Sequence, residues 1–190
     1  MLAHYELYKS IVNLPGYIVE CGFLKGASLI RFCTFREILE SPHSRKIIGF
    51  DAFGKFPKQD YANDQAFVKR FEGDAEDGIS IDALKEVLSH KRFENYELIK
   101  GDIVYTLPEY ISNHPELKIA LLHIDVDVYK PSVVILNHLF DKVVRDGLVV
   151  FDDFGTVAGE TKAIDEFFLE KNVIIEKLPI SHIPSYIRKK

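Results

Sequence analysis

The sequence lacks the features that mark several specialised classes of protein. No apolar run approaches the length of a membrane span. The first residues, Met1 to Glu6, do not contain a basic region followed by an apolar one, so no signal peptide is visible and we expect a cytoplasmic protein. Cys21 and Cys33 are the two cysteines and do not form a Cys-x-x-Cys pair. We therefore expect two reduced thiols rather than a disulfide or a zinc site.

Basic charge is also scarce. The chain has 24 Lys and Arg residues against 29 Asp and Glu residues, a net charge of −5. This balance argues against nucleic acid as a partner, because binding phosphates requires a basic face. No internal repeat, low-complexity tract or linker is present. With 190 residues, 47% hydrophobic and 28% charged, the composition is typical of one globular domain, residues 1–190.

The most informative stretch runs from Leu121 to Gly155. It begins and ends with short apolar runs that indicate buried strands, each followed by acidic residues. Between them, residues 130–145 have apolar side chains at helical spacing. The order strand, helix, strand predicts two parallel neighbouring strands. Their carboxyl ends meet at one edge of the sheet, where open α/β sheets bind ligands.

The same alternation extends along the whole chain and predicts a doubly wound α/β fold: a mostly parallel, seven-stranded sheet with helices on both faces. The segment 54–80 is long and polar, which is typical of a lid over a ligand site or of a mobile surface loop. The first helix would cover the sheet or a partner subunit, so a homo-oligomer is one expectation. Strands are expected at 17–22, 46–53, 96–102, 118–126, 146–153, 173–178 and within 180–188, and helices at 1–13, 28–40, 61–71, 81–91, 106–112, 130–145 and 160–171.

A carboxylate ends each of the first five expected strands. Gly22 and Gly26 follow the first strand, where glycine lets the backbone approach a ligand and a helix N-terminus offers free N–H groups. The spacing is not the Gly-x-Gly-x-x-Gly dinucleotide fingerprint. Asp51 can accept hydrogen bonds from both hydroxyls of a ribose, although a helix cap or turn is the alternative interpretation. The five acids are Glu20, Asp51, Asp102, Asp125 and Asp152.

Asp125, Asp152 and Asp153 are the candidate metal ligands. Together with Asp127 they would repel one another at the strand ends unless a cation or protons neutralised them. Oxygen ligands favour a hard cation, Mg²⁺ above all. The alternatives are a capping turn at Asp152 and Asp153, and a buried acid bonded to the backbone at Asp125. His123 lies inside the strand, and we expect a core histidine with one satisfied nitrogen.

Six segments of the chain together resemble the macrocin-type sugar O-methyltransferases, and the resemblance runs from about Asn13 to the C-terminus. This family consists of class I methyltransferases that use S-adenosylmethionine and Mg²⁺ to methylate sugar hydroxyls of natural products. The segments are Val-Glu-Cys-Gly with Lys-Gly-Ala-Ser (19–28), Gly-Phe-Asp-Ala-Phe (49–53), Lys-Gly-Asp with Thr-Leu-Pro (100–108), His-Ile-Asp-Val-Asp-Val-Tyr (123–129), Asp-Gly-Leu-Val-Val-Phe-Asp-Asp-Phe-Gly (146–155) and Ala-Ile-Asp-Glu-Phe (163–167).

The resemblance implies a role for each matching residue. S-adenosylmethionine would be bound by a set of residues along the first three strand ends, with Asp51 at the ribose and Asp102 beside the adenine. Asp125 would also act as the general base, and Mg²⁺ would lower the pKa of the acceptor hydroxyl and orient it. The implied sets are Glu20, Gly22, Gly26, Ser28, Asp51 and Asp102 for the cofactor, Asp125, Asp152 and Asp153 for the metal, and Asp127 and Tyr129 for the acceptor.

The acceptor and two other functions stay open at this point. Residues 55–78 match no substrate motif, and Asp146-Gly147 stands where relatives usually have Gly-Gly. A small hydroxylated molecule is expected: a sugar by resemblance, while a phenol or catechol would satisfy the same chemistry. Asp125-x-Asp127 also fits the metal and diphosphate site of a nucleotide-sugar glycosyltransferase. A non-catalytic, cofactor-binding domain is the third alternative.

Overall fold

The computed structural model of the protein describes residues 1–74 and 78–190 and contains one seven-stranded sheet. The strand order is β3-β2-β1-β4-β5-β7-β6. Strands β1 to β5 are parallel to one another, β7 is antiparallel to β5, and β6 is antiparallel to β7. This architecture confirms the predicted doubly wound α/β fold. The strands are β1 Tyr17–Cys21, β2 Ile47–Asp51, β3 Tyr96–Lys100, β4 Ile119–Ile124, β5 Val143–Phe151, β6 Glu176–Lys177 and β7 Ser185–Arg188.

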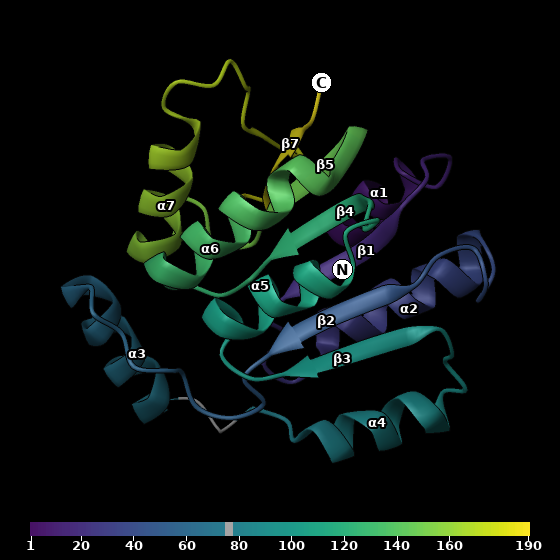
Figure 1. The fold of residues 1–190 in the computed structure, drawn as a ribbon, viewed down its shortest axis with the longest axis horizontal. Helices are drawn as coiled ribbons and strands as arrows, with labels where there is room; N and C mark the ends of the chain where they lie inside the picture. Colours follow the sequence, from purple (N-terminus) through teal and green to yellow (C-terminus); the bar gives the residue numbers. More distant parts are fainter. Residues whose placement is uncertain (75–77) are drawn as a thin grey trace.

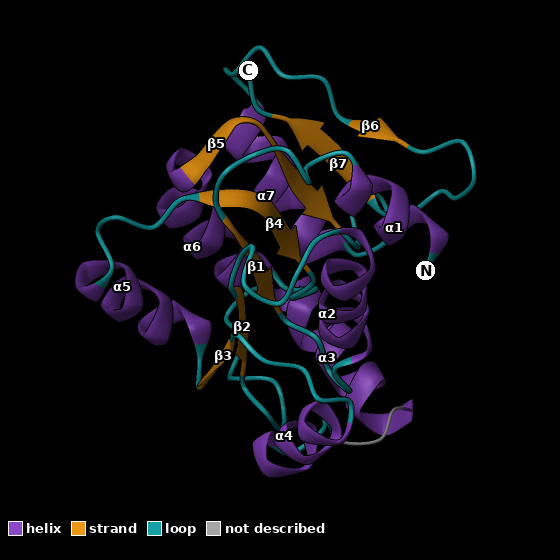
Figure 2. Ribbon diagram, turned by 90° about the vertical axis from the view of Figure 1, so that its right-hand side faces the viewer, coloured by secondary structure: helices purple, strands orange, loops and turns teal. Residues whose placement is uncertain are grey.

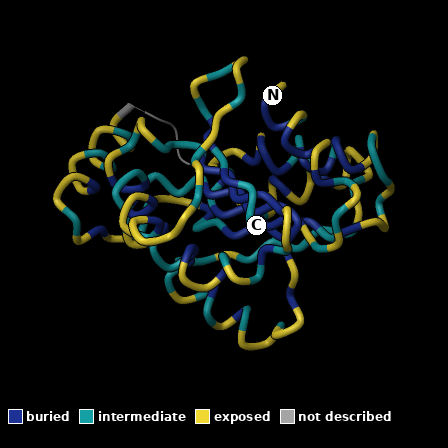
Figure 3. The backbone as a smooth tube through the Cα atoms, turned by 90° about the horizontal axis from the view of Figure 1, so that it is seen from above, coloured by how far each residue is buried: buried dark blue, intermediate teal, exposed yellow. Residues whose placement is uncertain are grey.

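Two layers of helices cover the sheet (Figures 1 and 2). One layer holds α5, α6 and α7, whose apolar side chains pack on one core cluster; the other holds α1, α2 and α4, which pack on a second cluster. The central strands are buried on both faces, and the exposed residues lie in the outer helices and loops (Figure 3). The helices are α1 Leu2–Lys9, α2 Ala27–Leu39, α3 Ala62–Asp74, α4 Ile81–His90, α5 Ile103–Asn113, α6 Tyr129–Leu139 and α7 Ala158–Phe168.

Alternation along the central strands decides which face each side chain meets. Ile18, Leu121 and Leu148 contribute to the cluster under α1, α2 and α4. Their strand neighbours Val19 and Leu122 contribute to the cluster under α5, α6 and α7. Because successive strand residues point to opposite faces, Glu20 and His123, which are in contact, lie on the side of Ile18 and Leu121.

Several element boundaries differ from those expected. Helix α5 begins earlier, at Ile103, because the side chain of Asp102 caps it by accepting a hydrogen bond from Val104 N. Helix α6 ends at Leu139 and a 3₁₀ turn follows, so β5 starts at Val143. The strand expected at 173–178 shortens to β6, two residues paired with β7.

The segment 54–80 contains α3, which lies at the carboxyl end of the strands beside α7 (Figure 1). Residues 75–77 of the expected lid lie outside the described residues, and closure of this segment stays a prediction. Among residues 1–74 and 78–190, no helix is long and apolar enough to cross a membrane.

Candidate active site

A cavity of about 410 Å³ opens at the carboxyl ends of the first five strands. This volume falls within the usual range for small-molecule sites. The loops that follow these strands form its walls, and apolar rings from 54–74 border it at Phe56 and Phe71. Eight of the residues predicted from sequence line it: Gly22, Ser28, Asp51, Asp102, Asp125, Asp127, Asp152 and Asp153.

Gly22 brings two of these loops into direct contact. Its φ of 81° lies in the left-handed region, and a Cβ there would stand 1.9 Å from the carbonyl oxygen of Asp125. Asp125 N donates to the carbonyl of Cys21 at 2.9 Å, which fixes the same approach. Since a side chain does not fit, the loop after β1 and the loop after β4 meet at glycine and form one wall of the cavity.

Asp51 and Asp102 hold the loops on the other side of the cavity. The carboxylate of Asp51 accepts hydrogen bonds from Phe23 N at 2.9 Å and Phe53 N at 2.6 Å. Burial raises the pKa of Asp51, and these two N–H donors oppose the rise. Each of these acids can accept hydrogen bonds from backbone N–H groups and still offer oxygen lone pairs to a ligand in the cavity, because a carboxylate has about four lone-pair sites.

Asp125, Asp127 and Asp153 form an oxygen cluster in which one carboxylate oxygen from each lies within 4.8 Å of the others. Burial, together with Asp153 and Asp125, raises the pKa of Asp127 to about 9. Burial also raises the pKa of Asp125 and of Asp153, with repulsion from Asp152 adding to both. Such a cluster requires protons or a cation, and an oxygen-only donor set fits Mg²⁺.

Glu160 of α7 supports the oxygen cluster through the backbone of two of its aspartates, a role that no sequence motif indicates. It is fully buried; its Oε1 accepts from Asp153 N at 3.2 Å, and its own N–H donates to the carbonyl of Asp127 at 3.1 Å. Burial and the nearby Asp153 raise the pKa of Glu160 well above its usual value. Glu160 thus holds the backbone of both aspartates from the side of α7.

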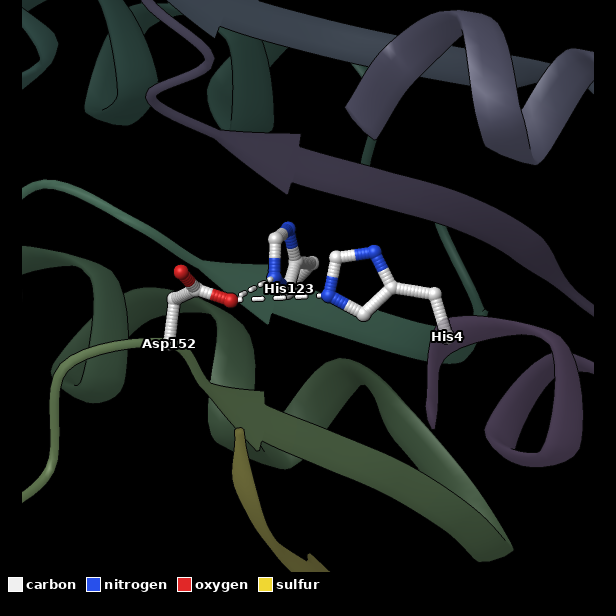
Figure 4. Close-up of side chains that lie close together, drawn as sticks. All are labelled: His4, His123 and Asp152. Atoms are coloured by element: carbon white, nitrogen blue, oxygen red, sulfur yellow. Dashed lines mark hydrogen bonds and ion pairs between the residues drawn. The ribbon is translucent and has the colours of Figure 1, made fainter. Parts of the chain in front are cut away.

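Asp152 lines the same cavity and also contacts two histidines. Its Oδ1 lies 3.4 Å from His123 Nε2 and 3.5 Å from His4 Nε2 (Figure 4). Although burial opposes ionisation, hydrogen bonds from His123 and His4 hold the pKa of Asp152 below its usual range. His123 is fully buried, and its Nδ1 contacts Glu20 Oε1 at 3.1 Å. The expectation of one satisfied nitrogen is therefore wrong, because both ring nitrogens have carboxylate partners.

Asp152 and Asp153 directly follow the last residue of β5 and have different neighbours. Asp152 meets the two histidines, while Asp153 meets Asp125 and Asp127. His4, which completes the first group, comes from α1 and carries no motif that the sequence could reveal.

Three predicted site residues lie outside the cavity walls, and their ligand roles stay predictions. Glu20 is fully buried against His123. Gly26 begins α2 with φ 77°, and a Cβ there would meet Leu84 rather than the cavity. Tyr129 points outward: its hydroxyl donates to Glu166 Oε2 at 2.6 Å.

Helix α3 is attached to the site by a buried carboxylate. Asp64 is 1% exposed, and its Oδ2 accepts from Tyr129 N, the first residue of α6, at 2.8 Å. A Cβ at Gly159, in the first turn of α7, would meet Asp64 Oδ1 at 2.1 Å. The segment expected to be a lid thus packs on the helix that follows the Asp125–Asp127 loop.

Comparison with protein families gives one match across nearly the whole chain. The model for macrocin O-methyltransferase (TylF) matches residues 6–189. A curated relative, demethyldecarbamoylnovobiocin O-methyltransferase from Streptomyces niveus, is 26% identical over 177 residues. This match covers 88% of the present chain and 64% of the relative, so the chain spans slightly less than two thirds of that protein.

Solved structures give the same fold. The crystal structure of CalS11, a calicheamicin methyltransferase, superposes with a TM-score of 0.80 at 26% identity, covering 98% of this chain and 77% of that one. An apo structure of CalS11, described as a TDP-rhamnose 3'-O-methyltransferase, gives 0.79 at 28% identity with the same coverage. The O-methyltransferase NovP gives 0.84 at 21% identity, covering 98% and 78%, and supports the fold alone.

Proposed function

This chain belongs to the macrocin O-methyltransferase family, and from that premise we propose that it transfers a methyl group from S-adenosylmethionine to a hydroxyl of a sugar or a sugar-bearing small molecule. The observation that carries the proposal is the cavity with the oxygen cluster of Asp125, Asp127 and Asp153 in its wall. The acceptor class follows the names of the novobiocin and calicheamicin relatives.

The cofactor would occupy the part of the cavity lined by Gly22, Ser28, Asp51 and Asp102. When bound, it supplies a methyl group on a positively charged sulfur. Gly22 leaves room for it because no side chain stands between the loops, and Asp51 offers carboxylate oxygens at the end of the second strand, where ribose hydroxyls bind in such folds. Ser28 is in the first turn of α2, where backbone N–H groups favour negative charge.

We assign the cation to Asp125, Asp127 and Asp153, whose raised pKa values mark a site short of positive charge. When bound, Mg²⁺ lowers the pKa of a hydroxyl and orients it. Asp125 lies within the cluster, beside the place where the acceptor hydroxyl would meet the cation, and it is our candidate for the general base that removes the hydroxyl proton. The sequence also predicts Asp152 as a metal ligand. It lies beside these three aspartates, and its Oδ1 contacts His4 and His123.

Calorimetry with S-adenosylhomocysteine, with and without Mg²⁺, tests the proposal. We expect micromolar binding of the product cofactor, and Mg²⁺-dependent methylation when S-adenosylmethionine is supplied with a panel of nucleotide sugars, glycosides and catechols. Binding of a nucleoside diphosphate sugar without binding of S-adenosylhomocysteine would indicate a glycosyltransferase instead. Cofactor binding without transfer to any acceptor would favour a non-catalytic domain.

Two matched variants separate the candidate metal ligands. We expect Asp153→Asn to abolish Mg²⁺-dependent transfer and to leave S-adenosylhomocysteine binding within a few-fold of wild type. Asp152→Asn should bind Mg²⁺ normally if the assigned cluster is correct. Loss of Mg²⁺ binding in Asp152→Asn alone would restore the set expected from the sequence.

A further inference from the structure

A second hollow, with a volume of about 300 Å³, lies between α3 and the start of α7, two helices that stand side by side at the carboxyl end of the sheet (Figure 1). We propose that this α3–α7 groove is a carbohydrate subsite, which takes the neutral sugar ring next to the one that is methylated. The proposal rests on the methyl-transfer function proposed above and narrows the acceptor to a neutral glycoside of at least two rings. The groove is lined by Asn63, Asp64, Ala66, Phe67 and Arg70 from α3 and by residues 156–159 from the turn that begins α7.

The groove begins next to the oxygen cluster. The hydroxyl of Thr156, which lines the groove, lies 3.2 Å from Oδ1 of Asp153 and 2.9 Å from the carbonyl oxygen of the same residue. Asp153 belongs to the cluster to which we assign the cation and the acceptor hydroxyl. When one sugar ring presents a hydroxyl to the cluster, the next ring of a glycoside therefore has the groove beside it.

Stacked aromatic rings connect the cavity with the groove. Phe71 lines the cavity and Phe67 lines the groove. Their ring centroids are 5.7 Å apart, and the ring planes are inclined by 30°. A sugar ring carries C–H groups on its faces, and packing such a face on an aromatic ring removes apolar area from water. The two rings thus suit a ligand that extends from the cavity into the groove.

One buried carboxylate oxygen in the groove needs a donor. Asp64 is 1% exposed, and its Oδ2 accepts from Tyr129 N, whereas its Oδ1 has no hydrogen-bond partner among the described residues. This Oδ1 lies in the gap between the two helices, since a Cβ at Gly159 would stand 2.1 Å from it. Because a buried acceptor without a donor is unfavourable, a ligand hydroxyl that donates to Oδ1 would gain binding free energy.

Hydrogen-bond donors border the groove from both helices. Val157, the N-cap of α7, provides no capping side chain, and the N–H groups of Ala158 and Gly159 have no acceptor within residues 1–74 and 78–190. Arg70 of α3 is exposed, lies 6.0 Å from the centroid of the Phe67 ring and has no acid partner in the described part of the chain. Sugar hydroxyls can accept from all of these groups.

An anion is the alternative occupant, because a helix N-terminus and an arginine both attract negative charge. However, the carboxylate of Asp64 lies against Gly159 in the first turn of α7 and already places negative charge there. A second anion would be repelled by it. A neutral sugar satisfies both kinds of group, since its hydroxyls donate to Asp64 and accept from Arg70 and the backbone.

Two measurements on the full chain test the subsite. Methyl glycosides of rhamnose, glucose and galactose are assayed as acceptors with S-adenosylmethionine, each alone and each with a second neutral sugar at the anomeric oxygen. We expect the two-ring form of an accepted sugar to have a KM at least about tenfold lower at similar kcat. In ¹⁵N NMR titrations, the two-ring glycosides should also shift the amide signals of Ala158 and Gly159, whose N–H groups border the groove.

A matched pair of variants fills the groove or leaves it open. Ala66→Trp adds bulk inside the groove from an exposed position of α3, and Ala62→Trp adds the same side chain at an exposed position of this helix outside the groove. Ala66→Trp should raise the KM of the two-ring acceptor at least about tenfold with little change in kcat, while Ala62→Trp should behave as wild type. Equal melting temperatures of the two variants would show that the fold is not the cause.

Each outcome decides the proposal. Equal KM values for one-ring and two-ring acceptors, or an unchanged KM in Ala66→Trp, would overturn the subsite and leave the methyl-transfer function standing. Amide shifts at Ala158 and Gly159 without transfer to any acceptor would support a sugar site in the groove and reject the methyl-transfer function. Shifts of these signals by inorganic phosphate but not by the glycosides, or by neither, would overturn the neutral-sugar assignment.

Discussion

Gly22→Ala should damage both stability and cofactor binding, and Gly155→Ala separates the causes. The two glycines have nearly the same φ, 81° and 82°. A Cβ at Gly155 meets nothing within 4 Å, whereas a Cβ at Gly22 stands 1.9 Å from the carbonyl oxygen of Asp125. The conformational penalty is therefore common to both variants, and the difference between them measures the close approach of the two loops.

The magnitudes follow from these two contributions. A left-handed conformation costs an alanine roughly 1–2 kcal/mol, which Gly155→Ala should lose in full. In Gly22→Ala the Asp125 carbonyl must also retreat by roughly 1.5 Å to reach van der Waals contact, which breaks the N–H bond to Cys21. We expect a further loss of about 1–3 kcal/mol, comparable to other backbone strain.

Urea unfolding gives the two stabilities, and calorimetry with S-adenosylhomocysteine gives the two affinities. Gly155→Ala should bind the product cofactor as wild type does, while Gly22→Ala should bind it at least tenfold more weakly, a difference of about 1.4 kcal/mol. Equal stability and equal affinity in the two variants would refute the close approach as the reason for glycine at this position.

Three further predictions concern the acids around the cavity. Glu160→Ala should weaken Mg²⁺ binding measured by calorimetry, whereas Glu160→Gln should bind Mg²⁺ as wild type does, because an amide oxygen can still accept the hydrogen bond from Asp153 N. Equal loss of Mg²⁺ binding in both variants would exclude this hydrogen bond as the role of Glu160. Since the pKa of Asp127 is raised from 3.8 to about 9, the metal-free fold binds more protons than the unfolded chain, so stability should fall as pH rises between about 4 and 9. Asp127→Asn should flatten that fall in pH-dependent thermal unfolding, and an unchanged slope would contradict the assignment. Asp64→Ala should cost about 1–3 kcal/mol in urea unfolding by leaving Tyr129 N without its partner, and should raise the acceptor KM more than the cofactor Kd.

The sheet and its helices could be predicted from the sequence because the signals are local and repeated. Apolar runs followed by acids marked β1 to β5, and helical spacing marked the segments between them. The short β6 was expected to be longer, since Val173-Ile174-Ile175 has the composition of a strand. Among the strands that the structure describes, β6 pairs with β7 alone, and the pairing covers Glu176 and Lys177.

The candidate site was harder to predict because its partners are distant in sequence. The acids at the ends of β4 and β5 were visible as residue types, yet their grouping depended on which face each occupies. His4 meets Asp152 across 148 positions, and Glu160 reaches Asp153 only after the chain turns into α7. Neither contact leaves a periodic or motif signal, so side-chain geometry was needed to find both.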